Sequence, residues 1–342
     1  MFRSSCALMA ATLTLVGSAS AQTYSLSYDG PSVDRWMYPF NPTPGVRITA
    51  STFSSYPDPQ FDDRDGQFIV GFTTASDVPT GLGSESYSIS SAVLRVQIAT
   101  DLAFAYDATA DSYRGYLSSD DPEYQPDADP GEPIELFGTG FRNGFTAASF
   151  AENSPYSPFG PFGQGIRNAF ALGHDESSAP IDVSLSVTER FDPVPFATGA
   201  IDSVTPGDLV PAGSVVEFSL DVANPDVQAY LRDAVDQGRL LLTVTSLTRV
   251  VQMGGSFPSY FCREHPNVPL NIAEAAQLEM VVVVGSGCEG DVDGSGAVTF
   301  ADLLSILAAW DSCIDCPEDL NDDGEVGFDD LLIVLSAWGP CP

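Results

Sequence analysis

The C-terminal end of the chain contains an internal repeat, which constrains the fold more than any other sequence feature. A shift of 28 residues superimposes Cys288 on Cys316, Asp291 on Asp319, Gly296 on Gly324, Asp302 on Asp330, Trp310 on Trp338 and Cys313 on Cys341. Each copy has a twelve-residue loop, DVDGSGAVTFAD at 291–302 or DLNDDGEVGFDD at 319–330, followed by an apolar segment, LLSILAAW or LLIVLSAW. The shared spacing and residue types indicate two copies of one structural unit.

Both loops have the pattern of a calcium site. Calcium takes about six to eight oxygens, which such a loop supplies from positions 1, 3, 5, 7 and 12, and often through water from position 9. Position 6 is Gly296 or Gly324, where the chain must turn sharply. The predicted ligands of the first loop are Asp291, Asp293, Ser295, the Ala297 carbonyl, Thr299 through water, and Asp302. Those of the second are Asp319, Asn321, Asp323, the Glu325 carbonyl, a water near Gly327, and Asp330. We therefore expect two bound calcium ions.

The loops differ from ordinary EF-hands, which have a helix on each side and Glu at position 12. A strand-like segment, VVVVGSGCEG, precedes the first loop. Only residues 312–318 separate the Trp310-Asp311 end of the first apolar segment from the second loop, which leaves no room for an entering helix. Tandem loop-helix units with Asp at position 12 resemble the dockerin family, and the resemblance covers 288–341. It implies a small all-α module in which two calcium ions order two antiparallel helices, and a cohesin-like partner.

The surface that would meet such a partner departs from the family pattern. Loop positions 10 and 11, often used for cohesin recognition, are Phe300-Ala301 and Phe328-Asp329. The apolar helices have more apolar surface than they can bury against one another. A docking surface is therefore predicted around Phe300 and Phe328, for a cohesin-like or other surface protein. The alternative is that calcium only folds a terminal cap.

Four cysteines flank the repeats: Cys288, Cys313, Cys316 and Cys341. In an exported chain such a cluster favours disulfides over zinc. Four cysteines can form two disulfides in three ways, and each of the three is compatible with the internal repeat. We favour Cys313 with Cys316 and Cys288 with Cys341, because antiparallel packing should bring the ends of the module together. Cys262 is left over and is expected to be a buried free thiol in a strand.

Residues 1–21 read as an export signal. Met1 and Arg3 precede an apolar run at 6–16, and Ala19-Ser20-Ala21 predicts cleavage after Ala21. This signal predicts an extracellular or cell-surface protein. No later apolar run reaches about 18 residues, so no membrane span is expected. The net charge of −34, with only 13 basic residues, argues against nucleic acid and anionic membranes as partners.

Residues 22–284 carry the signals of a β-sandwich domain, separated from the repeats by a linker at 285–287. Runs rich in β-forming residues lie at 67–74, 88–99, 181–187, 215–222, 239–247 and 278–284. One helix is predicted, capped by Asn224, continuing through 227–235 and ended by Gly238. Many strands with one crossing helix predict a mainly β fold, a jelly-roll-like sandwich.

Two segments of this domain, 64–98 with its YSISSAVLRVQI strand and FPSYFCREHPNVPLNI at 257–272, resemble disaggregatase-related jelly-roll domains. The resemblance implies binding of carbohydrate or of a cell surface. The segment 105–170 departs from that pattern and is rich in aromatic and acidic residues, a composition suited to stacking on sugars. The alternative, which we favour, is that its aromatic residues pack the loops onto the sandwich. They are Tyr106, Tyr113, Tyr116, Tyr124, Phe141, Phe145, Tyr156 and Phe159.

The sequence gives little indication of catalysis. His174 and His265 are the only histidines, and neither a G-x-S-x-G nor an H-E-x-x-H motif occurs. The run Asp62-Asp63-Arg64-Asp65 is interpreted as a solvated turn. We expect a secreted, non-catalytic carbohydrate-binding or cell-surface structural protein with a calcium-dependent docking module. The alternative is a carbohydrate-active enzyme attached through its tail to a polysaccharide-degrading complex. A groove with two carboxylates about 5–10 Å apart would favour that alternative.

Overall fold

The structure is a computed structural model that describes residues 22–175, 177–250, 256–285, 290–293, 295, 297–312, 316–321 and 323–340. The predicted signal segment 1–21, linker residues 286–287, Gly296, Cys288, Cys313 and Cys341 lie outside the described residues. The chain divides into two compact units, one formed by Thr23–Val284 and the other containing the described residues from Gly285 on. The two are described separately below.

The larger unit is mainly β. Its first sheet has the order β1 (Gln22–Tyr28), β15 (Gln277–Val284), β6 (Tyr87–Gln97) and β12 (Val215–Ser219). The β6 strand pairs antiparallel with both β15 and β12. Burial alternates along β15, where Leu278, Met280 and Val282 are buried and the residues between them are not. This sheet therefore covers the core with one face.

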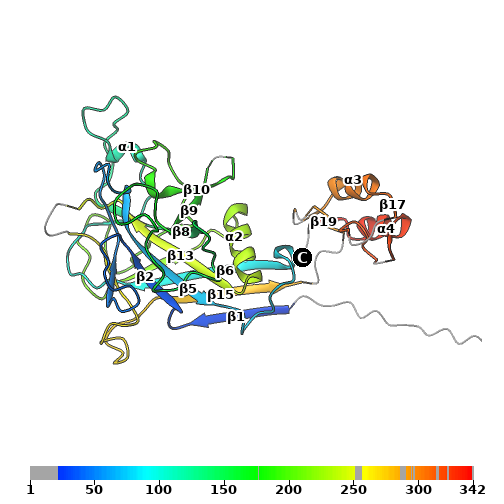
Figure 1. The fold of residues 1–342 in the computed structure, drawn as a ribbon, viewed down its shortest axis with the longest axis horizontal. Helices are drawn as coiled ribbons and strands as arrows, with labels where there is room; N and C mark the ends of the chain where they lie inside the picture. The colour runs from blue at the N-terminus through cyan, green and yellow to red at the C-terminus, as the bar shows by residue number, and fades with distance from the viewer. Residues whose placement is uncertain are drawn as a thin grey trace, which may run out of the picture. The chain divides into compact units, whose positions relative to one another are not determined.

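The second sheet has β10 (Pro180–Asp182), β9 (Ala169–His174), β8 (Glu132–Phe141), β13 (Arg239–Ser246), β5 (Arg64–Thr73) and β2 (Val33–Met37), in that order. The short strands β7 (Tyr106–Asp107) and β11 (Ala197–Thr198) pair with β8, and β4 (Phe53–Ser54) pairs with β5. A separate pair consists of β3 (Thr49–Ser51) and β14 (Ser259–Phe261). The central strands β5 and β13 lie side by side in Figure 1 and are buried along almost their whole length.

One apolar core joins the two sheets. It contains Leu94 and Leu278 from the first sheet, Phe68 and Leu242 from the second, and Leu231 from helix α2. Two antiparallel sheets with a shared core agree with the predicted β-sandwich class. Cys262 is a buried free thiol, as expected, but it lies directly after β14 and not in a strand.

Helix α2 (Pro225–Asp236) confirms the one long helix predicted in this unit. The Asn224 side chain accepts a hydrogen bond from the Asp226 N–H at 2.9 Å, and Gly238 follows the helix with a φ of 75°. Shorter helical turns are η1 (Ser84–Ser86), α1 (Tyr113–Tyr116) and η2 (Val183–Leu185).

The predicted strand at 181–187 is wrong. Only its first two residues belong to β10, and the chain then turns into η2. The Asp182 carboxylate caps this turn by accepting the Ser184 N–H at 2.9 Å, and the Val183 carbonyl accepts a hydrogen bond from Arg64 at 3.1 Å. These local contacts outweigh the β propensity of the alternating sequence.

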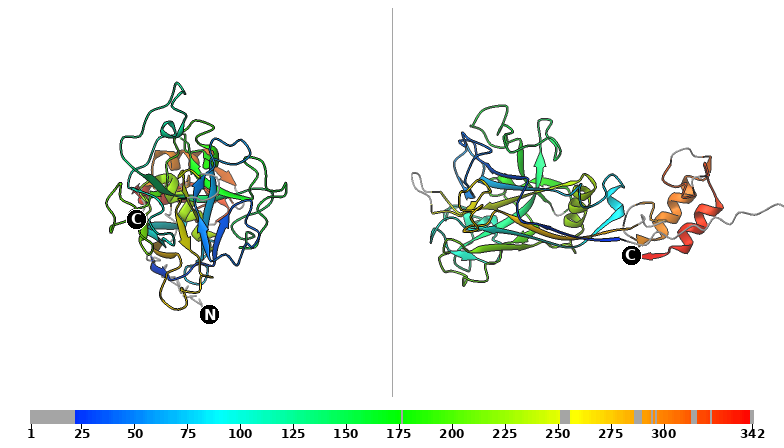
Figure 2. Two further views of the ribbon diagram at one scale, coloured as in Figure 1. Left: turned by 90° about the vertical axis from the view of Figure 1, so that its left-hand side faces the viewer. Right: turned by 90° about the horizontal axis from the view of Figure 1, so that it is seen from below.

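The smaller unit contains helices α3 (Phe300–Ala308) and α4 (Phe328–Ser336), side by side in Figure 2. Strand β16 (Ala297–Val298) pairs with β19 (Gly339–Pro340), and β17 (Asp311–Ser312) pairs with β18 (Glu325–Val326). Each pair joins the start of one helix to the end of the other, so the helices are antiparallel. Their core is small, with only Val298, Ile306, Val326 and Val334 buried among the described apolar residues. None of the described helices is long and apolar enough to cross a membrane.

Candidate calcium sites in the C-terminal repeats

The aspartate at position 12 closes each loop on itself. Asp302 accepts the Asp293 N–H through Oδ1 at 3.1 Å and the Thr299 N–H through Oδ2 at 2.7 Å. Asp330 accepts the Leu320 N–H through Oδ1 at 2.8 Å and the Gly327 N–H through Oδ2 at 2.7 Å. Each aspartate lies in the first turn of its helix, where the helix dipole favours an anion. The last predicted ligand of each loop is therefore held in place by the backbone.

These contacts also explain where the helices begin. The apolar segments at 303–310 and 331–338 indicated later starts, whereas α3 and α4 begin at Phe300 and Phe328. Thr299 caps α3, because its hydroxyl accepts the Ala301 N–H at 3.2 Å. Burial opposes ionisation of Asp302, but the N–H donors around it prevail and hold its pKa below the usual value.

In the first loop the structure brings the predicted carboxylates together. The Ser295 N–H lies 3.0 Å from both Asp291 Oδ1 and Asp293 Oδ1, and the Ser295 hydroxyl donates to the Ala297 carbonyl at 3.1 Å. Carboxylate oxygens of Asp291, Asp293 and Asp302 lie within 4.8 Å of one another. Calcium–oxygen distances of about 2.3–2.6 Å place opposite ligands about 4.6–5.2 Å apart, so this spacing suits a calcium ion.

The second loop has hydrogen bonds like those of the first, but its carboxylates are less closely grouped. The Asp323 N–H donates to Asp319 Oδ1 at 3.1 Å and to Asn321 Oδ1 at 2.9 Å. The Gly324 N–H donates to Asp319 Oδ2 at 2.8 Å. As far as the described residues go, Asp319, Asp323 and Asp330 do not form a cluster as tight as that of the first loop. Glu325, whose carbonyl is the predicted ligand, begins β18.

The sequence that carries the two loops contains no basic residue. After His265 the sequence contains no Lys, Arg or His residue. Carboxylates packed within a few ångströms repel one another, and a bound divalent cation converts that repulsion into attraction. The chemistry available to these loops is therefore cation binding through oxygen.

Apolar side chains are exposed on both helices. Phe300 and Phe328, at the loop-helix junctions, are 62% and 63% exposed. Leu304, Leu307 and Trp310 are exposed on the first repeat, and Leu332, Leu335 and Trp338 on the second. The surplus apolar surface that the sequence predicted is therefore present.

In the larger unit, most aromatic residues of the segment 105–170 pack onto the protein. Tyr106, Tyr113 and Tyr116 are buried, and Tyr124, Phe141, Phe145 and Tyr156 pack against buried clusters. Phe159, with 71% of its surface exposed, is the exception among the eight residues named from the sequence, and Phe162 of the same segment is exposed as well. The packing interpretation is thus confirmed for all but Phe159.

The interpretation of Asp62–Asp65 as a solvated turn is wrong. All four side chains are buried. Arg167 Nε donates to Asp62 Oδ2 at 2.6 Å, and Arg64 Nη2 donates to Glu135 Oε2 at 2.7 Å. The charged side chains can be buried because they are paired with residues from distant parts of the chain. The residues next to the run in the sequence do not indicate these partners.

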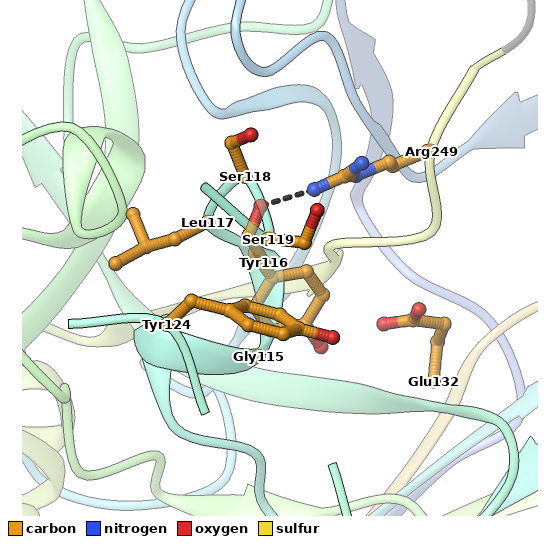
Figure 3. A pocket seen from close by; sticks show the side chains of 8 residues that line it. All are labelled: Gly115, Tyr116, Leu117, Ser118, Ser119, Tyr124, Glu132 and Arg249. Atoms are coloured by element: carbon orange, nitrogen blue, oxygen red, sulfur yellow. Dashed lines mark hydrogen bonds between the residues drawn. The ribbon is translucent and has the colours of Figure 1, made fainter. Parts of the chain in front are cut away.

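A polar pocket of about 530 Å³ lies beside α1 (Figure 3). Its lining residues are Gly115, Tyr116, Leu117, Ser118, Ser119, Tyr124, Glu132 and Arg249. Arg249 Nη2 donates a hydrogen bond to the Tyr116 carbonyl (Figure 3). Burial raises the pKa of Glu132 to about 7, against the opposing effect of the Tyr116 hydrogen bond. Among the described residues that line the pocket, Glu132 is the one carboxylate.

Comparison with known proteins gives no family. No family model matches the chain, and no curated protein does. Among solved structures, the VP1 protein of Trichodysplasia spinulosa-associated polyomavirus in complex with GM1 oligosaccharide is 10% identical, with a TM-score of 0.22, over 80% of this chain and 97% of that one. A likeness at that score says nothing about the fold or function of this chain.

Proposed function

We propose that this chain is a secreted, non-catalytic carbohydrate-binding or cell-surface structural protein whose dockerin-like C-terminal repeats bind two calcium ions and dock onto a partner. The observation that carries the proposal is the clustering of Asp291, Asp293 and Asp302 in a stretch of sequence, from Gly285 on, that has no basic residue. The export signal at 1–21 agrees with it, because calcium outside cells is plentiful enough to fill sites of modest affinity. The four cysteines flanking the repeats would close the module in the same compartment.

The docking part of the proposal is supported by the exposed junctions at Phe300 and Phe328. Apolar side chains exposed in the same place on two repeats suit a protein partner of the cohesin-like kind. Phe300 and Phe328 are at loop position 10, which supplies none of the predicted calcium ligands. A partner could therefore contact both side chains without replacing a ligand.

The carbohydrate part is supported by a pair of exposed aromatic rings on the larger unit, which we propose folds as a jelly roll. The rings of Phe40 and Phe162 meet edge to face, with centroids 5.5 Å apart, and each is about half exposed. Phe159 is exposed nearby in sequence. Sugar rings stack on such faces, so a polysaccharide is the proposed ligand of this unit. Detection of polysaccharide cleavage by the purified chain would favour the enzyme alternative instead.

Calcium titration of the full chain by calorimetry tests the metal sites. We predict two ions bound by the repeats, and loss of both in the variant Asp291→Asn with Asp319→Asn. With a dissociation constant of about 10 μM and about 1 mM calcium, each ion would stabilise the unit by roughly 2.7 kcal/mol. The matched control is Asp329→Asn, which removes one exposed charge next to Asp330 and should bind calcium as before. Unchanged binding in the double variant would refute the assignment of these loops.

Docking is tested with Phe300→Ser and Phe328→Ser together. A calcium-dependent partner captured from cell-surface proteins should be lost, while calcium binding stays within about twofold of the wild type. The control is Leu209→Ser, which changes an exposed apolar residue of the larger unit. If calcium is bound and no partner is captured by any variant, the repeats act only as a cap. A glycan array read with and without calcium tests the sandwich separately.

A further inference from the structure

A second group of carboxylates lies in the larger unit. Asp107 ends β7, Asp111 comes just before α1, and Asp127 and Asp129 lie in the loop that leads to β8. One carboxylate oxygen from each of the four lies within 4.8 Å of the others. The loop is folded back over α1 by the Gln125 N–H, which donates to the Arg114 carbonyl at 3.3 Å. Two segments separated along the chain therefore deliver acidic side chains to one place.

Asp107 gives independent reason to look for a ligand there. Its side chain is 1% exposed, and its buried Oδ2 has no hydrogen-bond partner. Its other oxygen, Oδ1, accepts both the N–H and the hydroxyl of Thr109, at 2.8 and 2.9 Å. A buried carboxylate oxygen without a partner is strongly unfavourable.

Arginine does not compensate this group as it does elsewhere in the same unit. Among the described residues, none of the ion pairs involves Asp107, Asp111, Asp127 or Asp129. Asp127 and Asp129 are exposed, whereas Asp107 is buried. The cluster is thus open to solvent on one side and closed by an unpartnered oxygen on the other, which is the layout of a site that an ion enters from solution.

We propose that Asp107, Asp111, Asp127 and Asp129 bind a third calcium ion. Four carboxylates from two segments of the chain provide the numerous, irregularly placed oxygens that calcium accepts at about 2.3–2.6 Å. Magnesium requires a tighter octahedron at about 2.0–2.1 Å and tends to keep its waters, so it suits this group less well. The Thr109 hydroxyl, 3.0 Å from Asp129 Oδ2, links the two halves of the site.

The ion would connect the site to the pocket of Figure 3. The Tyr116 hydroxyl donates to Asp111 Oδ2 at 2.8 Å, and Tyr116 also lines the pocket. Binding at the four aspartates would therefore fix the loop before β8 and one wall of the pocket together.

The test counts calcium ions per full chain by equilibrium dialysis and elemental analysis. We expect three ions in the wild type and one in the repeat variant Asp291→Asn with Asp319→Asn. We expect two in Asp127→Asn with Asp129→Asn, whose exposed positions should leave folding intact. The control Asp120→Asn, an exposed aspartate of the same loop, should keep all three.

A second readout uses terbium as the probe on the repeat variant. Terbium bound at the aspartates should luminesce when tyrosine is excited, and Tyr116→Phe should reduce that signal at least twofold. A repeat variant that binds no calcium, or Asp127→Asn with Asp129→Asn that keeps three ions, would overturn the proposal. One ion in both the wild type and the repeat variant would support this site and refute those of the repeats. Displacement of terbium by magnesium as readily as by calcium would overturn the choice of ion.

Discussion

The two units of this protein stabilise buried carboxylates in different ways. In the sandwich, Asp62 is paired with Arg167 and Glu135 with Arg64, and these side chains are at most 4% exposed. In the repeats, Asp302 and Asp330 are equally buried, yet among the described residues they accept hydrogen bonds from backbone N–H groups and from the uncharged Thr299 hydroxyl. The sandwich therefore carries its counter-charges in its own sequence, whereas we propose that the repeats take theirs from solution. The stability of the second unit should accordingly depend on dissolved cations, and most of the first should not.

The largest effect is expected from Arg167→Met. This change leaves Asp62 buried without its cation, and breaking such a pair costs about 3–5 kcal/mol. Urea unfolding of the full chain, followed through the sandwich transition, measures the loss. Arg95→Met is the matched control, because its partners Glu217 and Glu279 are 44% and 57% exposed, and it should cost less than about 1 kcal/mol. Equal costs for the two variants would contradict the role given to burial.

A smaller effect concerns Asp65, which lies farther from Arg167 than Asp62 does. Arg167 Nη2 lies 3.8 Å from Asp65 Oδ1, and burial raises the pKa of Asp65 to about 7 despite that charge. The folded state thus keeps a proton that the unfolded state has already released above about pH 4. The contribution of Asp65 to the free energy of unfolding therefore falls as the pH rises, by on the order of 2 kcal/mol between pH 5 and 7.

The measurement is the difference in unfolding free energy between the wild type and Asp65→Asn at several pH values. The wild type should lose stability relative to the variant over this range, because the amide does not titrate. Asp120→Asn, at an exposed site, should follow the wild type throughout. A difference that stays constant with pH would show that Asp65 is ionised in the folded protein.

The sequence predicted the parts of the fold that depend on local or repeated signals. The cap at Asn224, the alternating strand at 278–284 and the turn at Gly324 all depend on residues close in sequence. It failed at Asp62–Asp65 and at 181–187, where Arg167, Glu135 and Arg64 act across more than sixty residues of chain. The aspartates at 107, 111, 127 and 129 escaped notice for the same reason, because only folding brings their two segments together.

Hydrogen exchange of the full chain with and without a calcium chelator tests the central contrast most directly, since both units are observed in one sample. Chelation should abolish protection in α3 and α4, whose core of Val298, Ile306, Val326 and Val334 is too small to hold them alone. Protection in β5 and β13 should stay unchanged. Helices that remain protected in the chelator would contradict the account, because the repeats would then be stable without a cation from solution.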